Sequence, residues 1–272
     1  MTGSGAGAAV RRIDTTRPHP ARVYDWFLGG KDNYPVDEEL GRRITSIDAG
    51  APRAARSNRW FMQRATRLLV RELGIRQFLD IGSGIPTEPN LHQIAQSTAP
   101  EARVVYVDND PIVLAHAGAL LRGTPEGLTE YLQADAREPR TILDQAARLL
   151  DLDRPVALSL IALMHFVADA DGAYEMVETL VGALAPGSCL VLSAMTADLE
   201  PENVRRGIAA YAAGGVTLVA RTQDEVARFF EGLDLVEPGV VSVADWRPEL
   251  AEGESDLGPG PISLYGAVGV KR

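Results

Sequence analysis

The sequence has few of the residues that build covalent cross-links or metal sites. One cysteine and four histidines occur in 272 residues, so no disulfide can form within the chain. The histidines are scattered, and no H-x-x-E or C-x-x-C spacing indicates a metal site, so no metal is expected. Cys189 stands inside the apolar run SCLVLS, where we expect it to pack as a small hydrophobic residue.

A positive charge excess and long apolar runs are also missing. The net charge is -10, which disfavours binding to nucleic acid or to an anionic membrane surface. The longest apolar run, residues 155–168, is too short to cross a bilayer and is interpreted as a buried strand. The first residues contain arginines but no apolar core of a secretory signal. We therefore expect a cytoplasmic protein without nucleic-acid or membrane partners.

The pattern along the chain predicts one α/β domain with an N-terminal extension. Residues 1–20 are interpreted as a mobile tail, residues 21–60 as a helical cap, and residues 61–272 as the main domain. In the main domain, helical stretches separate short apolar runs: QFLDIG, RVVYVDND, LTEYLQAD, VALSLIAL and SCLVLSAM. This alternation predicts a Rossmann-like, doubly wound, mostly parallel sheet.

The remaining elements follow from local patterns. Two late apolar runs, LDLVEPGVVSVADW and ISLYGAVGVKR, predict a C-terminal antiparallel hairpin. Apolar periodicity and capping signals predict helices at residues 54–74, 111–121, 141–150, 172–184 and 201–213. The sequence does not indicate an oligomeric state.

The segment FLDIGSGIPTEPN has the pattern of a ligand-binding turn. It places Asp80 at the end of a strand, then Gly82 and Gly84, then signals for a helix start. Glycines let the backbone turn sharply and approach a ligand, and a helix start favours negative groups. The dinucleotide fingerprint needs a third glycine where Thr87 stands, so NAD fits poorly. The D-x-G-x-G-x-G turn typical of S-adenosylmethionine sites fits better, although Pro86 replaces its last glycine.

The next two predicted strands also end in acidic residues, Asp108 and Asp135. A carboxylate at Asp108 can accept both hydroxyls of a ribose. Asp135 can accept from an adenine amino group, and the Ala136 N–H can serve a ring nitrogen. The alternative is that each is a solvated carboxylate at a strand end. Because three acids share one edge of the sheet, we predict a cofactor site there, joined by Ser83 and Asn109.

With these residues the chain resembles the class I S-adenosylmethionine-dependent methyltransferases over residues 61–272. Within them it resembles an uncharacterised actinobacterial methyltransferase-like family, through ARVYDWFLGGKDNYPVDEEL, SNRWFMQRATRLL, FLDIGSGIPT and DLVEPGVVSVADWRP. The resemblance implies an S-adenosylmethionine-binding fold and methyl transfer to a small molecule, but it names no acceptor. The rival hypotheses are a protein that binds S-adenosylmethionine without catalysis and an NAD-dependent oxidoreductase.

His165 follows the fourth strand and is the candidate catalytic base. The alternative is a histidine that only packs beneath the cofactor. On the predicted helix 201–213, Tyr211, Arg205 and Arg206 can face an acceptor, although a solvated arginine pair is the more ordinary interpretation.

The aromatic segment YDWFLGGKDNYPVDEEL is the most distinctive part of the sequence. It follows no predicted strand and lacks the spacing of a phosphate loop, and it is too aromatic for a linker. We predict a cap over the carboxyl edge of the sheet, with Tyr24 and Tyr34 near the cofactor and Lys31 and Arg59 near its carboxylate. The alternative is that the aromatic residues only attach the segment to the core.

Overall fold

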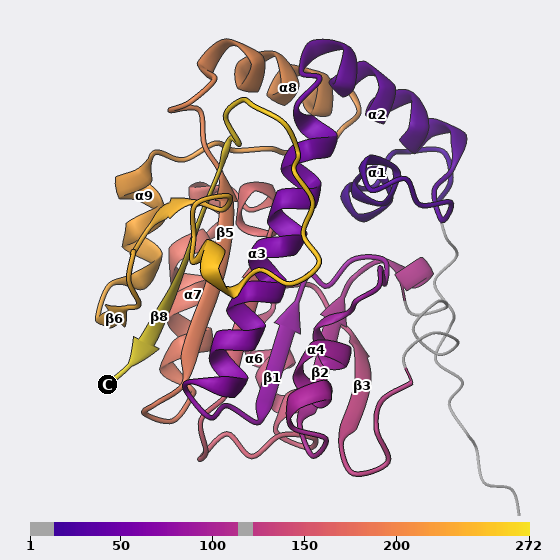
Figure 1. Ribbon diagram of the computed structural model, residues 1–272. Helices are drawn as coiled ribbons and strands as arrows, with labels where there is room; N and C mark the ends of the chain where they lie inside the picture. The colour runs from indigo at the N-terminus through magenta and orange to yellow at the C-terminus, as the bar shows by residue number, and fades with distance from the viewer. Residues whose placement is uncertain (1–13, 114–121) are drawn as a thin grey trace, which may run out of the picture.

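The computed structural model describes residues 14–113 and 122–272. A central sheet lies between two layers of helices, and a third group of helices covers its upper end (Figure 1). The strand order is β3-β2-β1-β4-β5-β8-β6, and β7 pairs with β8. The strands are β1 (Gln77–Ile81), β2 (Arg103–Asp108), β3 (Leu128–Gln133), β4 (Ala157–Ile161), β5 (Cys189–Met195), β6 (Leu233–Leu235), β7 (Val241–Ser242) and β8 (Leu264–Lys271).

The pairing confirms the predicted fold class. Strands β1 to β5 are parallel to one another. Strand β8 runs antiparallel beside β5 and also pairs antiparallel with β6 and β7. The two late apolar runs therefore do form the antiparallel end of the sheet. Because parallel strands end at the same edge, the residues that follow β1, β2, β3 and β4 are brought together there.

Alternating side chains of the strands build two cores. On β1, Phe78 packs against α3 and α4, whereas Leu79 packs against α6 and α7 on the other face. Both side chains are fully buried, as expected for a sheet covered on both faces. The helices are α1 (Pro20–Phe27), α2 (Pro35–Ile47), α3 (Ala51–Arg71), α4 (Leu91–Thr98), α6 (Pro139–Ala146), α7 (Ala173–Gly182), α8 (Pro201–Ala213) and α9 (Gln223–Ala227).

The predicted helices match these elements with small shifts in their ends. The boundary proposed between cap and domain at residues 60 and 61 falls inside α3, which belongs to both parts. Most of the helix predicted at 111–121 and most of the predicted tail lie outside the described residues. None of the helices in the described residues is long and apolar enough to cross a membrane.

Helices α1 and α2 fold over the carboxyl edge of the sheet, next to α8 (Figure 1). Helix α1 ends at Phe27, and Gly29 follows it with a φ of 81°, a left-handed conformation that glycine adopts readily. The chain then turns, and Pro35 begins α2. Val23 and Leu40 pack with Tyr211 of α8 in an apolar cluster, so the aromatic segment is a folded cap.

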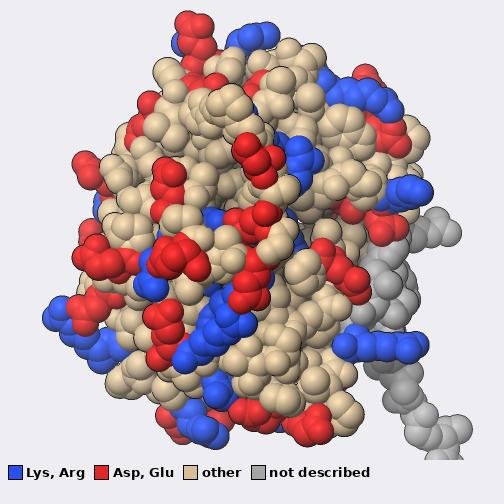
Figure 2. Space-filling view, in the orientation of Figure 1, with Lys and Arg blue, Asp and Glu red and all other residues tan. Residues whose placement is uncertain are grey.

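The loop between β7 and β8 crosses the outer face of α3 (Figure 1). Arg64 and Arg67 of α3 are both buried beneath it. Arg64 pairs with Glu254, with Nη1 and Oε2 separated by 2.6 Å, and Arg67 pairs with Glu252. Acidic and basic side chains are intermixed on the face seen in Figure 2. The acidic loop is thus held against the helix by ion pairs.

Candidate functional site

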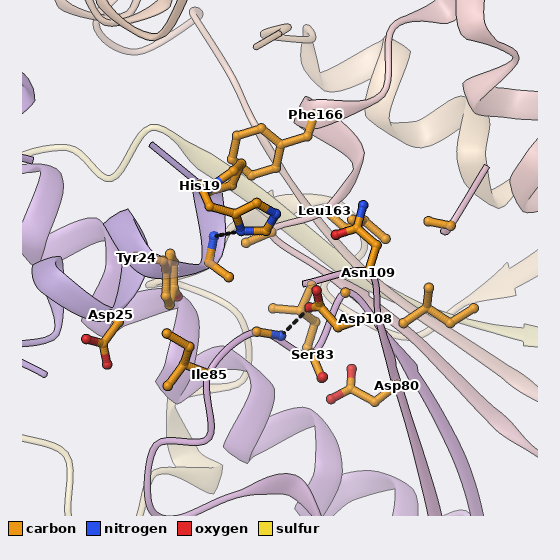
Figure 3. Close-up of a pocket in the computed structure, with 18 of the residues that line it drawn as sticks. His19, Tyr24, Asp25, Asp80, Ser83, Ile85, Asp108, Asn109, Leu163 and Phe166 are labelled. Atoms are coloured by element: carbon orange, nitrogen blue, oxygen red, sulfur yellow. Dashed lines mark hydrogen bonds between the residues drawn. The ribbon is translucent and has the colours of Figure 1, made fainter. Parts of the chain in front are cut away.

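The main cavity opens at the carboxyl ends of β1, β2, β3 and β4, beneath the cap. Its volume is about 420 Å³, which lies within the range of about 300 to 1,000 Å³ for small-molecule sites. In Figure 3, His19 and Tyr24 from the cap lie on one side, whereas Asp108 and Asn109 lie on the other. The predicted site residues that line it are Tyr24, Arg59, Asp80, Gly82, Ser83, Gly84, Asp108, Asn109, Asp135 and Ala136.

The turn after β1 needs its glycines for geometric reasons. Gly82 has a φ of 74° and Gly84 a φ of 66°, both in the left-handed region that other residues rarely adopt. A Cβ atom at Gly82 would lie 2.8 Å from a methyl group of Leu163. The Gly82 N–H donates to the Val107 carbonyl at 2.7 Å, which fixes the turn against β2.

Asp108 is held rigidly at the end of β2. Its Oδ2 accepts from the Gly84 N–H at 2.8 Å (Figure 3). Its Oδ1 accepts from the Asp110 N–H at 3.0 Å. Each carboxylate oxygen keeps capacity for a further donor. Burial raises the pKa of Asp108, and burial also raises the pKa of Asp80 to about 6. Asp108, which is buried, and Asp80, which is half-buried, both line the cavity from adjacent strands.

Asp135 also lines the cavity, but its carboxylate is paired with an arginine. Arg137 donates from Nε to Oδ1 at 3.0 Å and from Nη2 to Oδ2 at 2.7 Å. These hydrogen bonds lower the pKa of Asp135. The Arg137 backbone N–H also donates to Oδ1 at 3.0 Å, so Asp135 accepts three hydrogen bonds and has less acceptor capacity left for a ligand than Asp108, which accepts two.

Of the predicted cofactor contacts, Arg59 is engaged by backbone carbonyls, and Lys31 and Tyr34 lie outside the cavity wall. Arg59 lines the cavity but donates from Nη2 to the carbonyls of Thr87 and Pro89, the latter at 2.9 Å. Lys31 is exposed and lies outside the cavity wall. Tyr34 also lies outside it and stacks with the Arg22 guanidinium, 5.4 Å from the ring centre. Tyr34 packs instead with Ala21 and Ile85, which line the cavity themselves.

The cap is tied to the strand ends by a buried charge network that the sequence analysis missed. Asp110, just after β2, faces His19 Nδ1 at 3.1 Å and Arg22 Nε at 3.3 Å. Arg22 also faces Asp37 of α2, with Nη1 and Oδ2 3.5 Å apart. Asp37 accepts from the backbone N–H groups of His19 at 2.8 Å and Tyr34 at 2.9 Å. No local motif marks this network, because its members come from distant segments.

A second connection runs from the cap to the ends of β4 and β5. The Tyr24 hydroxyl donates to the Ala55 carbonyl at 2.9 Å and accepts from Asn58 Nδ2 at 3.1 Å. Ser193 donates from Oγ to Asn58 Oδ1 at 2.6 Å and accepts from the Ala162 N–H at 3.0 Å. Ala162 has a φ of 55°, a strained conformation of the kind that concentrates at functional sites.

His165 does not line the main cavity. It is buried, and the Met195 N–H donates to its Nδ1 at 3.3 Å, so the neutral ring carries its hydrogen on Nε2. Burial, together with the nearby Arg221, lowers the pKa of His165 to about 3. A neutral imidazole with so low a pKa is a poor proton acceptor near neutral pH. The geometry favours the packed alternative, and the catalytic role stays a prediction.

The lowered pKa of His165 predicts a specific pH dependence of stability. Its pKa is about 3 in the fold and 6.5 when unperturbed, so acidification protonates the unfolded chain first. This contribution to stability is complete above the unfolded pKa and is lost as the pH falls toward 3. When the pH is lowered from 8 to 5, we expect the unfolding free energy to fall in both proteins. The fall should be about 2 kcal/mol smaller in His165→Asn than in wild type, as measured by urea denaturation. Equal losses in both proteins would contradict the neutral, buried assignment.

Arg221 is a buried residue with no recognisable signal in the sequence. It is 2% exposed and donates to the Met164 carbonyl at 2.6 Å and to the Val167 carbonyl at 2.8 Å. It also pairs with Asp169. Arg221 thereby fixes the loop after β4 that carries Phe166 to the cavity wall.

A second, smaller cavity of about 100 Å³ adjoins the main one. Pro20, Tyr24, Ala162 and Phe166 line both. Its other walls come from α2, α8, the end of β5 and the loop before β8, and they include His165 and Tyr211. Arg205 and Arg206 are exposed and lie outside this wall.

Comparison with known proteins identifies the family. The sequence model described as S-adenosyl methyltransferase matches residues 6–272. The chain belongs to this family. The family indicates S-adenosylmethionine as the cofactor and contradicts the NAD-dependent hypothesis. None of the curated proteins matches the chain.

Solved structures of similar proteins agree with this assignment. A DUF574 family protein from Streptomyces avermitilis is 50% identical, covers 96% of this chain and 100% of its own, and has a TM-score of 0.90. A protein from Thermobifida fusca is 39% identical, with coverages of 95% and 97% and a TM-score of 0.86. An S-adenosylmethionine-dependent methyltransferase from Anabaena variabilis is 11% identical with a TM-score of 0.52 over 97% of this chain and 99% of its own, and it shows the shared fold.

Proposed function

We propose that the chain transfers a methyl group from S-adenosylmethionine, held in the main cavity, to a small molecule held in the second cavity. The observation that carries this proposal is the shared wall of Pro20, Tyr24, Ala162 and Phe166. Methyl transfer requires donor and acceptor to be aligned with water excluded. Two adjoining cavities under one cap meet that requirement.

The residues of the main cavity suit the proposed cofactor. Asp108 and Asn109 would hold the ribose, and Asp135 with Ala136 would face the adenine. Gly82 and Gly84 leave the backbone without side chains at the turn. Arg59 and Asp80 carry the opposite charges that a zwitterionic amino acid requires. When bound, S-adenosylmethionine supplies a sulfonium methyl group that is already strongly electrophilic.

The main role of the protein is then to position the donor and the acceptor, and not to remove a proton. The network of Asp110, Arg22 and Asp37 keeps the cap over the cavity. Tyr24 and Phe166 separate the two cavities and would orient the acceptor. Because His165 is neutral with a low pKa, an acceptor would react as an uncharged nucleophile or lose its proton to solvent.

Two measurements test this function. Calorimetric titration should show binding of S-adenosylmethionine and none of NAD, and the opposite result would overturn the proposal. Formation of S-adenosylhomocysteine with a panel of small acceptors should then show catalysis. The poor basicity of His165 favours one competing function, which is binding of S-adenosylmethionine without transfer of its methyl group. Tight binding with no turnover over a broad panel would favour that function.

A further inference from the structure

The second cavity has an unusual balance of charge. Among the described residues that line it, none is lysine or arginine, and the two that carry charge are Asp48 and Glu200. The rest of the wall is mainly apolar and includes Phe27, Ile44, Ile47, Ala51, Ala54, Val204, Leu218 and Leu264. An apolar wall with only negative groups disfavours carboxylates and phosphates as occupants.

The two carboxylates differ in the strength of the hydrogen bonds that they already accept. Asp48 ends α2, and its Oδ1 accepts from the Gly50 N–H at 2.7 Å. Glu200 precedes α8 and is half-buried. Its two oxygens accept from Asn203 Nδ2 and from Ser263 Oγ, both at the long distance of 3.4 Å.

Glu200 forms no ion pair with any residue in the part of the chain that the structure describes. A half-buried carboxylate beside an apolar surface gains most from a cationic partner that also donates hydrogen bonds. Both neutral neighbours, Asn203 and Ser263, can reorient to admit such a partner.

We propose that the second cavity selects a small apolar acceptor carrying an ammonium group, and that Glu200 binds this group. The identification of the occupant as the acceptor rests on the proposed function. The cavity of about 100 Å³ is smaller than the engineered cavity of about 150 Å³ that takes up benzene. It therefore admits a short branched alkyl group, or the end of a longer molecule. The net charge of -10 also attracts cations toward the protein.

The test uses three probes with similar skeletons and different charges. The full chain, saturated with S-adenosylhomocysteine, is titrated with isobutylammonium, isobutanol and isobutyrate at neutral pH. We expect the ammonium to bind at least about tenfold more tightly than the alcohol, because a charged hydrogen bond replaces a neutral one. The carboxylate is expected to bind more weakly than either. Isobutyrate binding as tightly as the ammonium, or no binding of the ammonium, would overturn the proposal.

Two variants at the start of α8 test whether Glu200 causes the preference for the ammonium. Glu200→Gln is expected to remove the advantage of the ammonium over the alcohol, since the amide has nearly the same shape without the charge. Glu202→Gln is the matched control, because Glu202 is exposed in the first turn of α8, next to Glu200, and lies outside the cavity wall. A thermal unfolding curve for each variant checks the fold. If Glu200→Gln keeps the full preference, Glu200 is not the binding group.

The two proposals fail in different ways. If S-adenosylhomocysteine does not bind, the proposed function fails, and the three probes are then titrated into the protein alone to test Glu200. If S-adenosylmethionine is turned over with neutral or anionic acceptors and not with amines, the function stands and the charge selectivity is wrong.

Discussion

Replacing Asp108 with alanine is expected to weaken S-adenosylmethionine binding by more than tenfold. The carboxylate is buried at the end of β2 and is held by the N–H groups of Gly84 and Asp110 at 2.8 and 3.0 Å. Alanine removes the acceptor proposed for the ribose and also leaves the Gly84 N–H without its partner. A charge-assisted hydrogen bond contributes about 1.5 to 3 kcal/mol, which corresponds to a tenfold or larger change. Isothermal titration calorimetry measures the dissociation constant directly.

Two control variants test whether the loss of affinity is specific to Asp108. Glu130→Gln changes an exposed carboxylate of the neighbouring strand β3 and should leave affinity unchanged. Asp135→Asn should weaken binding less than Asp108→Ala, because Arg137 already occupies the Asp135 carboxylate. An unchanged dissociation constant in a folded Asp108→Ala protein would remove Asp108 from the cofactor site.

Replacing Asp37 with alanine is expected to destabilise the cap by about 3 to 5 kcal/mol, the usual cost of breaking a buried ion pair. Asp37 is fully buried, and its loss leaves two backbone N–H groups without their acceptor. It also removes one of the two carboxylates that face the Arg22 guanidinium. Hydrogen exchange should rise in α1 and α2 while the sheet stays protected. Affinity for S-adenosylmethionine should fall as well, because residues 18–21, at and just before the start of α1, line the main cavity.

The neighbouring residue offers a control for the Asp37 variant. Glu38 pairs with Arg42 on the surface of the same helix, so Glu38→Ala should change stability by no more than about 1 kcal/mol. If Asp37→Ala leaves both exchange in α1 and cofactor affinity at wild-type values, the network does not hold the cap closed.

Local sequence signals were sufficient for much of the fold and for one side of the site. Apolar runs of strand length predicted β1 to β5, and the glycines around Ser83 predicted the turn that the structure places beside Asp108. Such features depend on neighbours within a few residues, so a single sequence reveals them. Lys31 and Tyr34 were predicted near the cofactor but lie outside the cavity wall, because the packing of the cap and not the local sequence places them.

By itself, then, the sequence determined a mostly parallel α/β sheet with a glycine turn and acidic strand ends, because backbone periodicity and turn chemistry are local. Only the tertiary structure decided which distant residues meet. Arg22 lies between Asp110 and Asp37 and pairs with both. Asn58 forms hydrogen bonds with Tyr24 and Ser193. Glu200 lines a cavity whose wall is mainly apolar. Buried charges and hydrogen bonds between remote segments follow from packing, and no spacing along the chain encodes them.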